Sequence, residues 1–224
     1  MAVLTVSREL GSEGKRIAQR VAAILGYRLV GKDLIGEVLS EYGLIEFPAE
    51  YDSKLSIWDY FDGRAKVMIE MLNKVLLAVA ATDKVVILGR GCFALLNGYA
   101  DVINARIQAP FPVRVRRFAE RESIEEIGKA EAIVRRLDEA RAAFISSAYG
   151  LKWNDARLFD LMVDTGKIEP DQAAPWIADL LSTLSAKAPS GSKRVRGIEV
   201  DPVLANAVAL KLAENRPWDS FTSH

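Results

Sequence analysis

Short, continuous apolar segments alternate with amphipathic ones along most of this chain. AVLTVS (2–7) and VVIL (85–88) are apolar almost without interruption, which is typical of strands covered on both faces. Between such runs, apolar residues recur three and four positions apart, as in 15–25, and this spacing is typical of amphipathic helices. Strands that alternate with helices predict parallel βαβ units. The chain is therefore expected to form a three-layer α/β fold around a parallel central sheet.

The same patterns predict the bounds of each element. Strands are expected at residues 2–7, 27–30, 85–88, 101–109 and 161–163. Helices are expected at residues 15–25, 32–42, 64–81, 112–121, 123–147, 171–186 and 201–215. The segment 44–61 carries Pro48, several aromatic residues and mixed charge, and it is expected to be an irregular loop. Ligands of such folds bind beyond the carboxyl ends of the strands, so residues that follow strands are the first candidates for a site.

The composition changes near the C-terminus. Residues 187–200 are rich in small, polar and basic side chains and are interpreted as a linker, whose charges are solvated. Asp201 followed by Pro202 is typical of a helix start, and 201–224 is expected to be a helical appendage. A short isolated helix is marginal in water. We therefore expect it to dock on the same chain or, in a homo-oligomer, on a partner subunit.

The composition also excludes several kinds of site. Lys+Arg and Asp+Glu number 30 each, so the net charge gives no argument for binding nucleic acid or an anionic membrane. Cys92 is the single cysteine and His224 the single histidine, which excludes disulfides and argues against zinc sites and histidine bases. No signal peptide and no apolar run of membrane-spanning length are recognised. A cytoplasmic protein with no nucleic-acid or membrane partner is therefore expected.

A glycine-containing turn lies between the first expected strand and the first expected helix. The standard phosphate loop reads G-x-x-x-x-G-K-[ST], and Gly14 and Lys15 match its G-K. Glu9 stands in place of its first glycine, and Arg16 in place of its Ser or Thr. Small residues let backbone N–H groups surround a phosphate at a helix N-terminus, and the lysine bridges the outer phosphates. The residues expected to hold phosphate are Gly11, Ser12, Glu13, Gly14, Lys15 and Arg16.

Four segments together resemble the cytidylate-kinase-like family. They are TVSRELGSEGKRIAQRVAAILGYRLVGKDLI, VVILGRGCFALL, VRVRRFAERE and a final run with Asp138, Arg141, Phe144, Tyr149-Gly150, Trp153 and LFDLMVDT. The resemblance covers about residues 1–185 and accounts for Glu9 and Arg16, because the family's loop departs from the standard pattern in much this way. It implies a P-loop NTPase-type kinase domain at 1–186, with a helical lid at about 123–157 and acceptor-side insertions.

The resemblance also implies roles for individual residues in phosphoryl transfer from ATP. The catalytic candidates are Lys15, Arg141 and Lys152. The acceptor-binding candidates are Arg90, Arg64 and Asp33, the last of which is alternatively only a charge at a helix N-terminus. Gly91 and Gly31 stand where the family has acidic residues. No protein side chain is expected to ligate a metal, because ATP phosphates and water would hold Mg²⁺.

The activity that the resemblance implies is ATP-dependent phosphoryl transfer to a nucleoside monophosphate, CMP or dCMP in the first place. Two alternatives remain open at this point. A kinase for a different small acceptor is suggested by Gly31 and Gly91. A non-catalytic nucleotide-binding or regulatory module is suggested by Arg16, which lacks the hydroxyl that usually ligates Mg²⁺, and by the C-terminal extension. Tyr149 and Trp153 are interpreted as packing residues.

Overall fold

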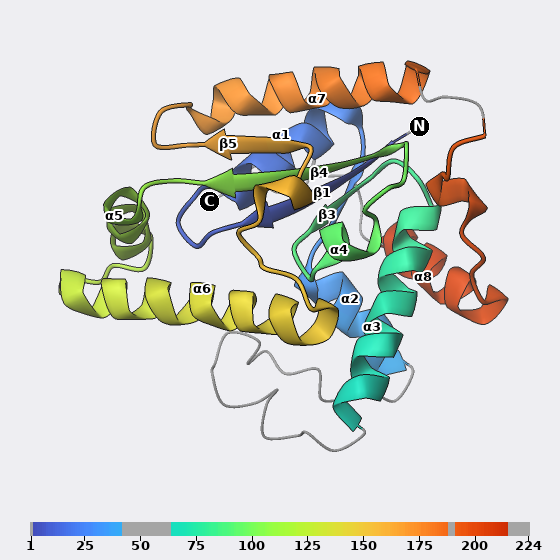
Figure 1. Ribbon diagram of the computed structural model, residues 1–224, viewed down its shortest axis with the longest axis horizontal. Coiled ribbons are helices and arrows are strands. Elements are labelled where there is room, and N and C mark those ends of the chain that lie inside the picture. Colours follow the sequence, from blue (N-terminus) through green and yellow to red (C-terminus); the bar gives the residue numbers. More distant parts are fainter. Residues whose placement is uncertain (1, 42–63, 188–190, 215–224) are drawn as a thin grey trace.

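A five-stranded parallel sheet forms the centre of the molecule. The computed structural model describes residues 2–41, 64–187 and 191–214. The strands are β1 (Val3–Arg8), β2 (Arg28–Val30), β3 (Val85–Leu88), β4 (Val102–Gln108) and β5 (Leu161–Asp164). Their order in the sheet is β2-β3-β1-β4-β5, and every neighbouring pair is parallel (Figure 1). The parallel sheet predicted from the alternating pattern is thus confirmed.

Helices cover both faces of the sheet, as a three-layer fold requires. On one face lie α1 (Gly14–Leu25) and α7 (Pro170–Lys187), which pack against each other (Figure 1). On the other face lie α2 (Lys32–Glu41), α3 (Arg64–Ala81), α4 (Cys92–Leu95), α6 (Ile127–Tyr149) and α8 (Pro202–Glu214). The helix α5 (Phe111–Arg121) packs against α6 beyond the carboxyl end of β4. Two short 3-10 turns lie at Ala156–Leu158 and Val195–Gly197.

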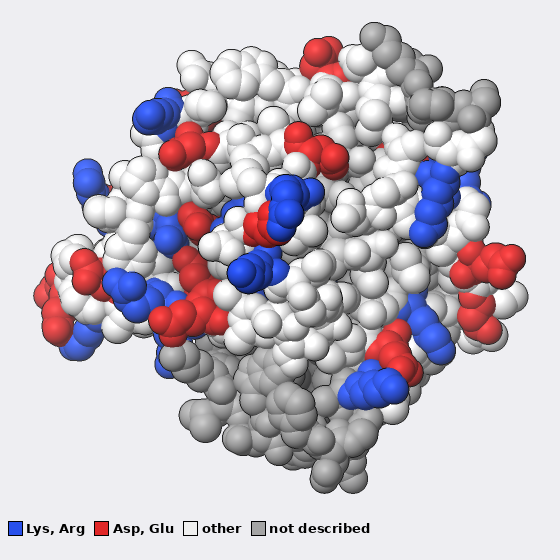
Figure 2. All heavy atoms as spheres, viewed as in Figure 1, with Lys and Arg blue, Asp and Glu red and all other residues white. Residues whose placement is uncertain are grey.

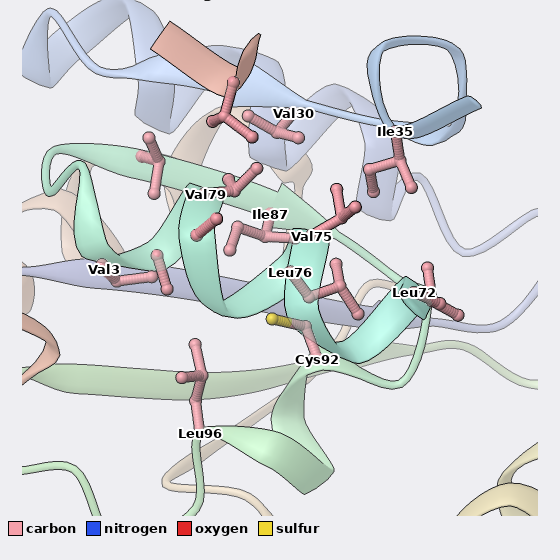
Figure 3. Packing of buried hydrophobic residues seen from close by; sticks show 14 of the residues in the cluster. Val3, Val30, Ile35, Leu72, Val75, Leu76, Val79, Ile87, Cys92 and Leu96 are labelled. Atoms are coloured by element: carbon pink, nitrogen blue, oxygen red, sulfur yellow. The ribbon is translucent and has the colours of Figure 1, made fainter. Parts of the chain in front are cut away.

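The two layers of the core follow from the two-residue period of the strands. Leu4 and Val6 of β1 pack on the side of α1 and α7, whereas Val3 points to the opposite side. In β3, Val86 packs with the first group and Ile87 with the second. Figure 3 shows the second group, in which side chains of α3 close over Val3 and Ile87. Burial on both faces explains why these strands are uninterrupted apolar runs.

The expected start of the lid helix was wrong by four residues. A helix was predicted from residue 123, but α6 begins at Ile127. Ser123 has a φ of 54°, in the left-handed region, so the chain turns there and the helix cannot run through it. The helix ends at Tyr149, where Gly150 adopts a left-handed C-cap. The other predicted strands and helices end within about two residues of their expected bounds, the usual uncertainty of helix and strand ends, whereas α4 and the two 3-10 turns were not predicted.

The C-terminal helix α8 folds back onto the same chain. It packs against α2 and α3, and Leu204, Val208 and Leu212 are buried in the core on that side of the sheet. Leu210 of the same helix is 57% exposed, so the buried face of α8 does not include it. We expected this helix to dock either on its own chain or on a partner subunit, and the structure shows the first. The predicted loop at 44–61 lies outside the described residues.

Charged side chains of both signs are interspersed on the face of the molecule that Figure 2 shows. This agrees with the equal numbers of basic and acidic residues in the sequence. In the described ranges, none of the helices combines the length and the apolar character needed to cross a membrane.

Candidate active site

A cavity of about 570 Å³ opens beyond the carboxyl ends of β1 and β3. Its lining includes residues 7–11 and 13–16, the turn at 89–91, and side chains of α6 such as Arg141. Parallel α/β sheets bind their ligands in this place, because the loops that leave the strands meet there. The cavity therefore brings together the phosphate loop, the Gly-Arg-Gly turn and the lid helix, which the sequence had marked separately.

The phosphate loop has the backbone shape that phosphate binding needs. Gly11 and Glu13 have φ values of 77° and 61°, and α1 begins directly afterwards at Gly14. The N-terminus of α1 therefore faces the cavity with its free N–H groups and the positive end of its dipole. A side chain at Gly11 would collide with the backbone carbonyl of Arg114, and one at Gly14 would press on Arg8. Close packing therefore requires glycine at both positions, and the left-handed φ of Gly11 requires it there a second time.

Glu9 explains why this loop differs from the standard motif at its first position. Its carboxylate forms ion pairs with Arg106 at 3.3 Å and Arg114 at 3.2 Å, and it accepts a hydrogen bond from the N–H of Ala109. Arg106 is 3% exposed, and burial lowers its pKa, while the charge of Glu9 opposes that shift. A guanidinium stays charged even so. Glu9 is therefore an internal anchor of the loop, and its side chain is held by protein groups.

Asp138 of α6 also anchors the loop, although the sequence marked it only as part of the lid pattern. Its carboxylate accepts a hydrogen bond from the N–H of Leu10 at 3.0 Å. It also forms ion pairs with Arg114 at 2.6 Å and with Arg141 at 2.9 Å. Glu9, Arg114 and Asp138 thus form one network that runs from the phosphate loop to the lid helix.

Arg16, at the position of the usual Ser or Thr, pairs with an acidic residue of α7. Its guanidinium lies 2.6 Å from Asp171, which Arg20 also contacts at 2.9 Å. The hydrogen bond from Arg20 and the positive charges of both arginines lower the pKa of Asp171. These side chains are exposed at the rim, and Arg16 still lines the cavity. The side chain that stands in place of the usual Ser or Thr therefore links α1 to α7.

The Gly-Arg-Gly turn has left-handed backbone conformation at all three residues, with φ values of 78°, 58° and 72°. A non-glycine residue is uncommon in that region, so the backbone at Arg90 is strained, as is frequent at functional sites. Arg90 lines the cavity, and its Nη1 atom is buried. A side chain at Gly91 would collide with the ring of Tyr149. The acidic side chain that the family resemblance implies in place of Gly91 therefore has no room in this backbone.

The ring of Tyr149 packs against this turn at Gly91. Its hydroxyl donates a hydrogen bond to Oδ1 of Asn73 at 2.9 Å, and its ring lies edge-on against Phe144. Burial raises the pKa of Tyr149 well above its usual range. The expected packing role of Tyr149 is confirmed. Trp153 is buried, donates its indole N–H to Ser7, and also lines the cavity.

The structure brings most but not all of the expected site residues to the cavity. The expected residues that line it are Gly11, Glu13, Gly14, Lys15, Arg16, Arg90 and Arg141. Ser12 is buried below it, where its hydroxyl donates to the carbonyl of Glu9. Asp33 and Lys152 are exposed and are not part of this lining. The side chain of Arg64 lies outside those that the structure describes.

Several lining residues were missed at the sequence level. Arg8 is the last residue of β1, and Lys32 lies two residues after β2 at the start of α2, so their positions at the carboxyl edge carried a usable signal. Phe93 follows the Gly-Arg-Gly turn by two residues, whereas Arg121 and Ile145 are brought to the cavity by α5 and α6, which the position of neither residue in the sequence indicates. The lining is therefore rich in arginine and lysine, with an apolar wall, as a site for a phosphorylated organic ligand requires.

Comparisons with known proteins agree with this geometry. Residues 3–167 match the sequence model described as the cytidylate kinase-like family. The cytidylate kinase of Thermoplasma acidophilum is 22% identical over 189 residues, which cover 82% of this chain and 94% of that protein. The cytidylate kinase of Pyrobaculum aerophilum is 28% identical over 186 residues, with the same two coverages. A crystal structure of an uncharacterized protein from Eubacterium ventriosum has a TM-score of 0.66 at 20% identity, over 82% of this chain and 99% of that one.

Proposed function

The chain belongs to the cytidylate kinase-like family and is a phosphotransferase, and we propose that it transfers the terminal phosphoryl group of ATP to CMP or dCMP. One observation carries the proposal. A glycine-lined helix N-terminus with Lys15 shares a single cavity with Arg90 and Arg141, which come from two other elements. Phosphoryl transfer needs positioning and neutralisation of charge more than it needs a proton-transfer group. The absence of a histidine from residues 1–223 is compatible with such a mechanism.

The phosphate loop would bind the donor. Backbone N–H groups of Gly11 to Gly14, at the positive end of α1, would surround the β-phosphate of ATP. Lys15, exposed at the cavity, would bridge the outer phosphates and neutralise charge on the departing ADP. The anchoring of the loop by Glu9 keeps these donors in place before ATP arrives, so little reorganisation is needed.

Two arginines would serve the acceptor and the transferred group. Arg90 follows β3, and its guanidinium suits bidentate contact with the acceptor phosphate. Arg141 reaches the cavity from α6 and would neutralise the equatorial oxygens of the transferring group. The acceptor oxygen would attack the γ-phosphorus, the bond to the ADP oxygen would break, and the products would be ADP and a nucleoside diphosphate.

Mg²⁺ would enter with ATP. The position after Lys15 carries Arg16, whose guanidinium is paired with Asp171 and offers no oxygen ligand. Among the described residues, no cluster of three His, Cys, Asp or Glu side chains is close enough to hold a metal ion. This donor set fits an ion that is held by phosphate oxygens and water, which is the usual preference of Mg²⁺. When bound, the ion would help to neutralise the negative charge of the ATP phosphates.

A different small acceptor is the second candidate function, and one observation favours it. The acidic positions of the family pattern are Gly31 and Gly91, and the ring of Tyr149 fills the space beside Gly91. A carboxylate is a good acceptor for the exocyclic amine of cytosine, so its loss at Gly91 relaxes the preference for that base.

The test is an ADP-release assay with ATP and a panel of acceptors that includes CMP, dCMP, UMP, AMP and small hydroxyl metabolites. We expect the highest kcat/KM with CMP or dCMP; a higher value with another acceptor establishes the second candidate instead. Lys15→Ala should lower kcat about 10²- to 10³-fold, because it removes one preorganised cation from the transition state. Lys129→Ala, on the exposed face of α6, is the matched control and should leave turnover unchanged. Equal activity of both variants would rule out the assigned role of Lys15.

A further inference from the structure

The carboxylate of Asp138 lies where the lid helix meets the phosphate loop. Its Oδ1 atom accepts from the N–H of Leu10 at 3.0 Å and from Nη1 of Arg141 at 2.9 Å. Its Oδ2 atom lies 2.6 Å from Nη1 of Arg114. Leu10 is 128 residues away in the sequence. Three donors from three separate segments thus converge on one side chain of α6.

Arg114 completes the hold on the loop. The same Nη1 atom that pairs with Asp138 also donates to the carbonyl of Leu10 at 3.1 Å. The N–H of Leu10 binds the carboxylate, so both backbone polar groups of this residue are tied to one ion pair. The next residue, Gly11, packs directly against the backbone carbonyl of Arg114. The conformation of the loop at Leu10 and Gly11 is therefore set by contacts with α5 and α6.

Arg141 is the second group that Asp138 orients. It lies one helical turn further along α6 and lines the cavity. Its side chain is 14% exposed and that of Asp138 is 16% exposed, so water screens this pair less than a surface pair. A flexible arginine loses rotamer entropy when it binds an anion. The contact with Asp138 restricts Arg141 before the anion arrives.

We propose that Asp138 is a positioning residue for phosphoryl transfer, which fixes the phosphate loop through Leu10 and orients Arg141 toward the transferring group. The orientation of Arg141 rests on the function proposed for that residue, whereas the hold on the phosphate loop rests on the contacts of Asp138 alone. The carboxylate of Asp138 thereby sets the distance between the phosphate loop, which carries Lys15, and the guanidinium of Arg141. The helix α6 and the phosphate loop move together, because Asp138 on α6 accepts a hydrogen bond from Leu10 of the loop and pairs with Arg114, which also bonds to Leu10.

The first experiment tests the hold on the loop without any turnover. Hydrogen exchange is followed in the peptide that contains residues 9–14, in the ligand-free protein and in Asp138→Ala and Asp138→Asn. We expect exchange to be about tenfold faster in Asp138→Ala, because the N–H of Leu10 loses a charged acceptor. Asp138→Asn keeps an oxygen for this N–H and should show a smaller increase. ATP affinity, measured by calorimetry, should fall in the same order.

The matched control is Glu131→Gln, which changes a carboxylate to an amide on the exposed side of the same helix. It should exchange and bind ATP as the wild type does. Asp138→Asn is nearly isosteric, so it carries the test if the alanine variant fails to fold. Wild-type exchange at 9–14 together with wild-type ATP affinity in folded Asp138 variants would overturn the proposal.

The second experiment separates orientation of Arg141 from general stability. In a double-mutant cycle on kcat, Asp138→Asn should lower turnover about tenfold in the wild type and much less in Arg141→Ala, because the group that it orients is already gone. Effects that multiply independently would mean that Asp138 only stabilises the fold and would overturn the orienting role. If no acceptor is turned over, the proposed kinase function fails, but the exchange and ATP-binding measurements still decide whether Asp138 holds the loop.

Discussion

The two ends of the sheet bury carboxylates in different ways. At the carboxyl end, Glu9 and Asp138 are paired with the buried guanidinium groups of Arg106 and Arg114, and the network reaches the cavity through Arg141. Charges in such places need partners, since an isolated buried charge is very unfavourable. The ion pairs at this end hold a loop and a helix that take part in the site.

At the amino end, the buried carboxylates serve the C-terminal segment instead. Asp101 is 4% exposed and accepts a hydrogen bond from the N–H of Val195 at 3.0 Å. The N–H of Ala100 donates to the carbonyl of Lys193, and Asp83 lies 3.4 Å from Arg196. These contacts attach the segment that leads into α8, which then packs on α2 and α3.

The difference teaches that burial of charge does not by itself mark a functional site. Both ends contain charged groups that are almost inaccessible to water: Arg106 and Arg114 at the carboxyl end, and Asp83 and Asp101 at the amino end. At the carboxyl end, the carboxylates pair with arginines that line the cavity or pack behind it. At the amino end, they bind the segment that leads into α8, through the N–H of Val195 and the side chain of Arg196. Changes at the carboxyl end should therefore alter ligand binding as well as stability, whereas changes at the amino end and in α8 should alter stability alone.

The largest effect is expected from Arg106→Met at the carboxyl end. This side chain is 3% exposed, pairs with Glu9, donates to the carbonyl of Trp153 and lies over the indole ring at 4.5 Å. Its removal takes away a buried guanidinium and leaves the partly buried carboxylate of Glu9 with one partner fewer, which should cost about 3 kcal/mol of unfolding free energy in urea denaturation. ATP affinity should fall as well, because Glu9 anchors the phosphate loop.

The matched control for Arg106→Met is Arg157→Met. Arg157 pairs with Asp155 at 2.7 Å, but its side chain is 88% exposed. A solvated pair of this kind contributes little, so stability and ATP affinity should stay near the wild type. Equal losses of stability and of ATP affinity in the two variants would show that the burial of Arg106 does not increase the contribution of its contacts.

The next effect is expected from Leu204→Ala in α8. The side chain is 4% exposed and belongs to the core formed with α2 and α3. Loss of its packing should lower the unfolding free energy by about 2–4 kcal/mol. Leu210→Ala makes the same change on the same helix at a residue that is 57% exposed, and it should have little effect. ATP affinity, measured on the folded protein, should be unchanged in both; a loss in Leu204→Ala would link α8 to the site.

A smaller effect is expected from Gly91→Ala at the carboxyl end. The residue has a φ of 72°, and its new methyl group would meet the ring of Tyr149. The strain should cost about 1–3 kcal/mol in thermal or urea unfolding, and it should displace the neighbouring Arg90. In Gly31→Ala the new methyl group has no atom within 4 Å, so that variant should keep its stability. If Gly91→Ala were as stable as Gly31→Ala, the steric reason for glycine would be wrong.

The smallest effect is expected at an exposed pair, in acid. Hydrogen bonds from Arg157 lower the pKa of Asp155 from 3.8 to about 2. Such a lowered pKa stabilises the folded state above about pH 3.8, and this contribution is lost as the pH falls toward 2. Asp155→Asn should therefore lose stability less steeply than the wild type between these two pH values, as followed by thermal melts in acid. An identical slope would show that the pair does not persist in solution.

Much of the fold could be predicted because its causes are local. The uninterrupted apolar run VVIL predicted a strand with two covered faces, and β3 is buried on both. Glycine and lysine between a strand and a helix indicated the phosphate loop, since that turn needs residues that tolerate its backbone. The lid helix was extended too far because the left-handed conformation of Ser123 has no sequence signal of comparable strength.

The sequence by itself therefore determined the order of strands and helices, the place of the phosphate loop and the family. Only the tertiary structure decided what holds the loop. The sequence showed only that Glu9 departs from the standard motif, and the structure shows that Arg106 and Arg114, about a hundred residues away, are its partners. In the sequence, Asp138 was only one residue of the segment that resembles the family, whereas in the structure its carboxylate accepts from the N–H of Leu10. The physical reason is that a charge can be buried only beside a partner, and the partner is chosen by how distant segments pack.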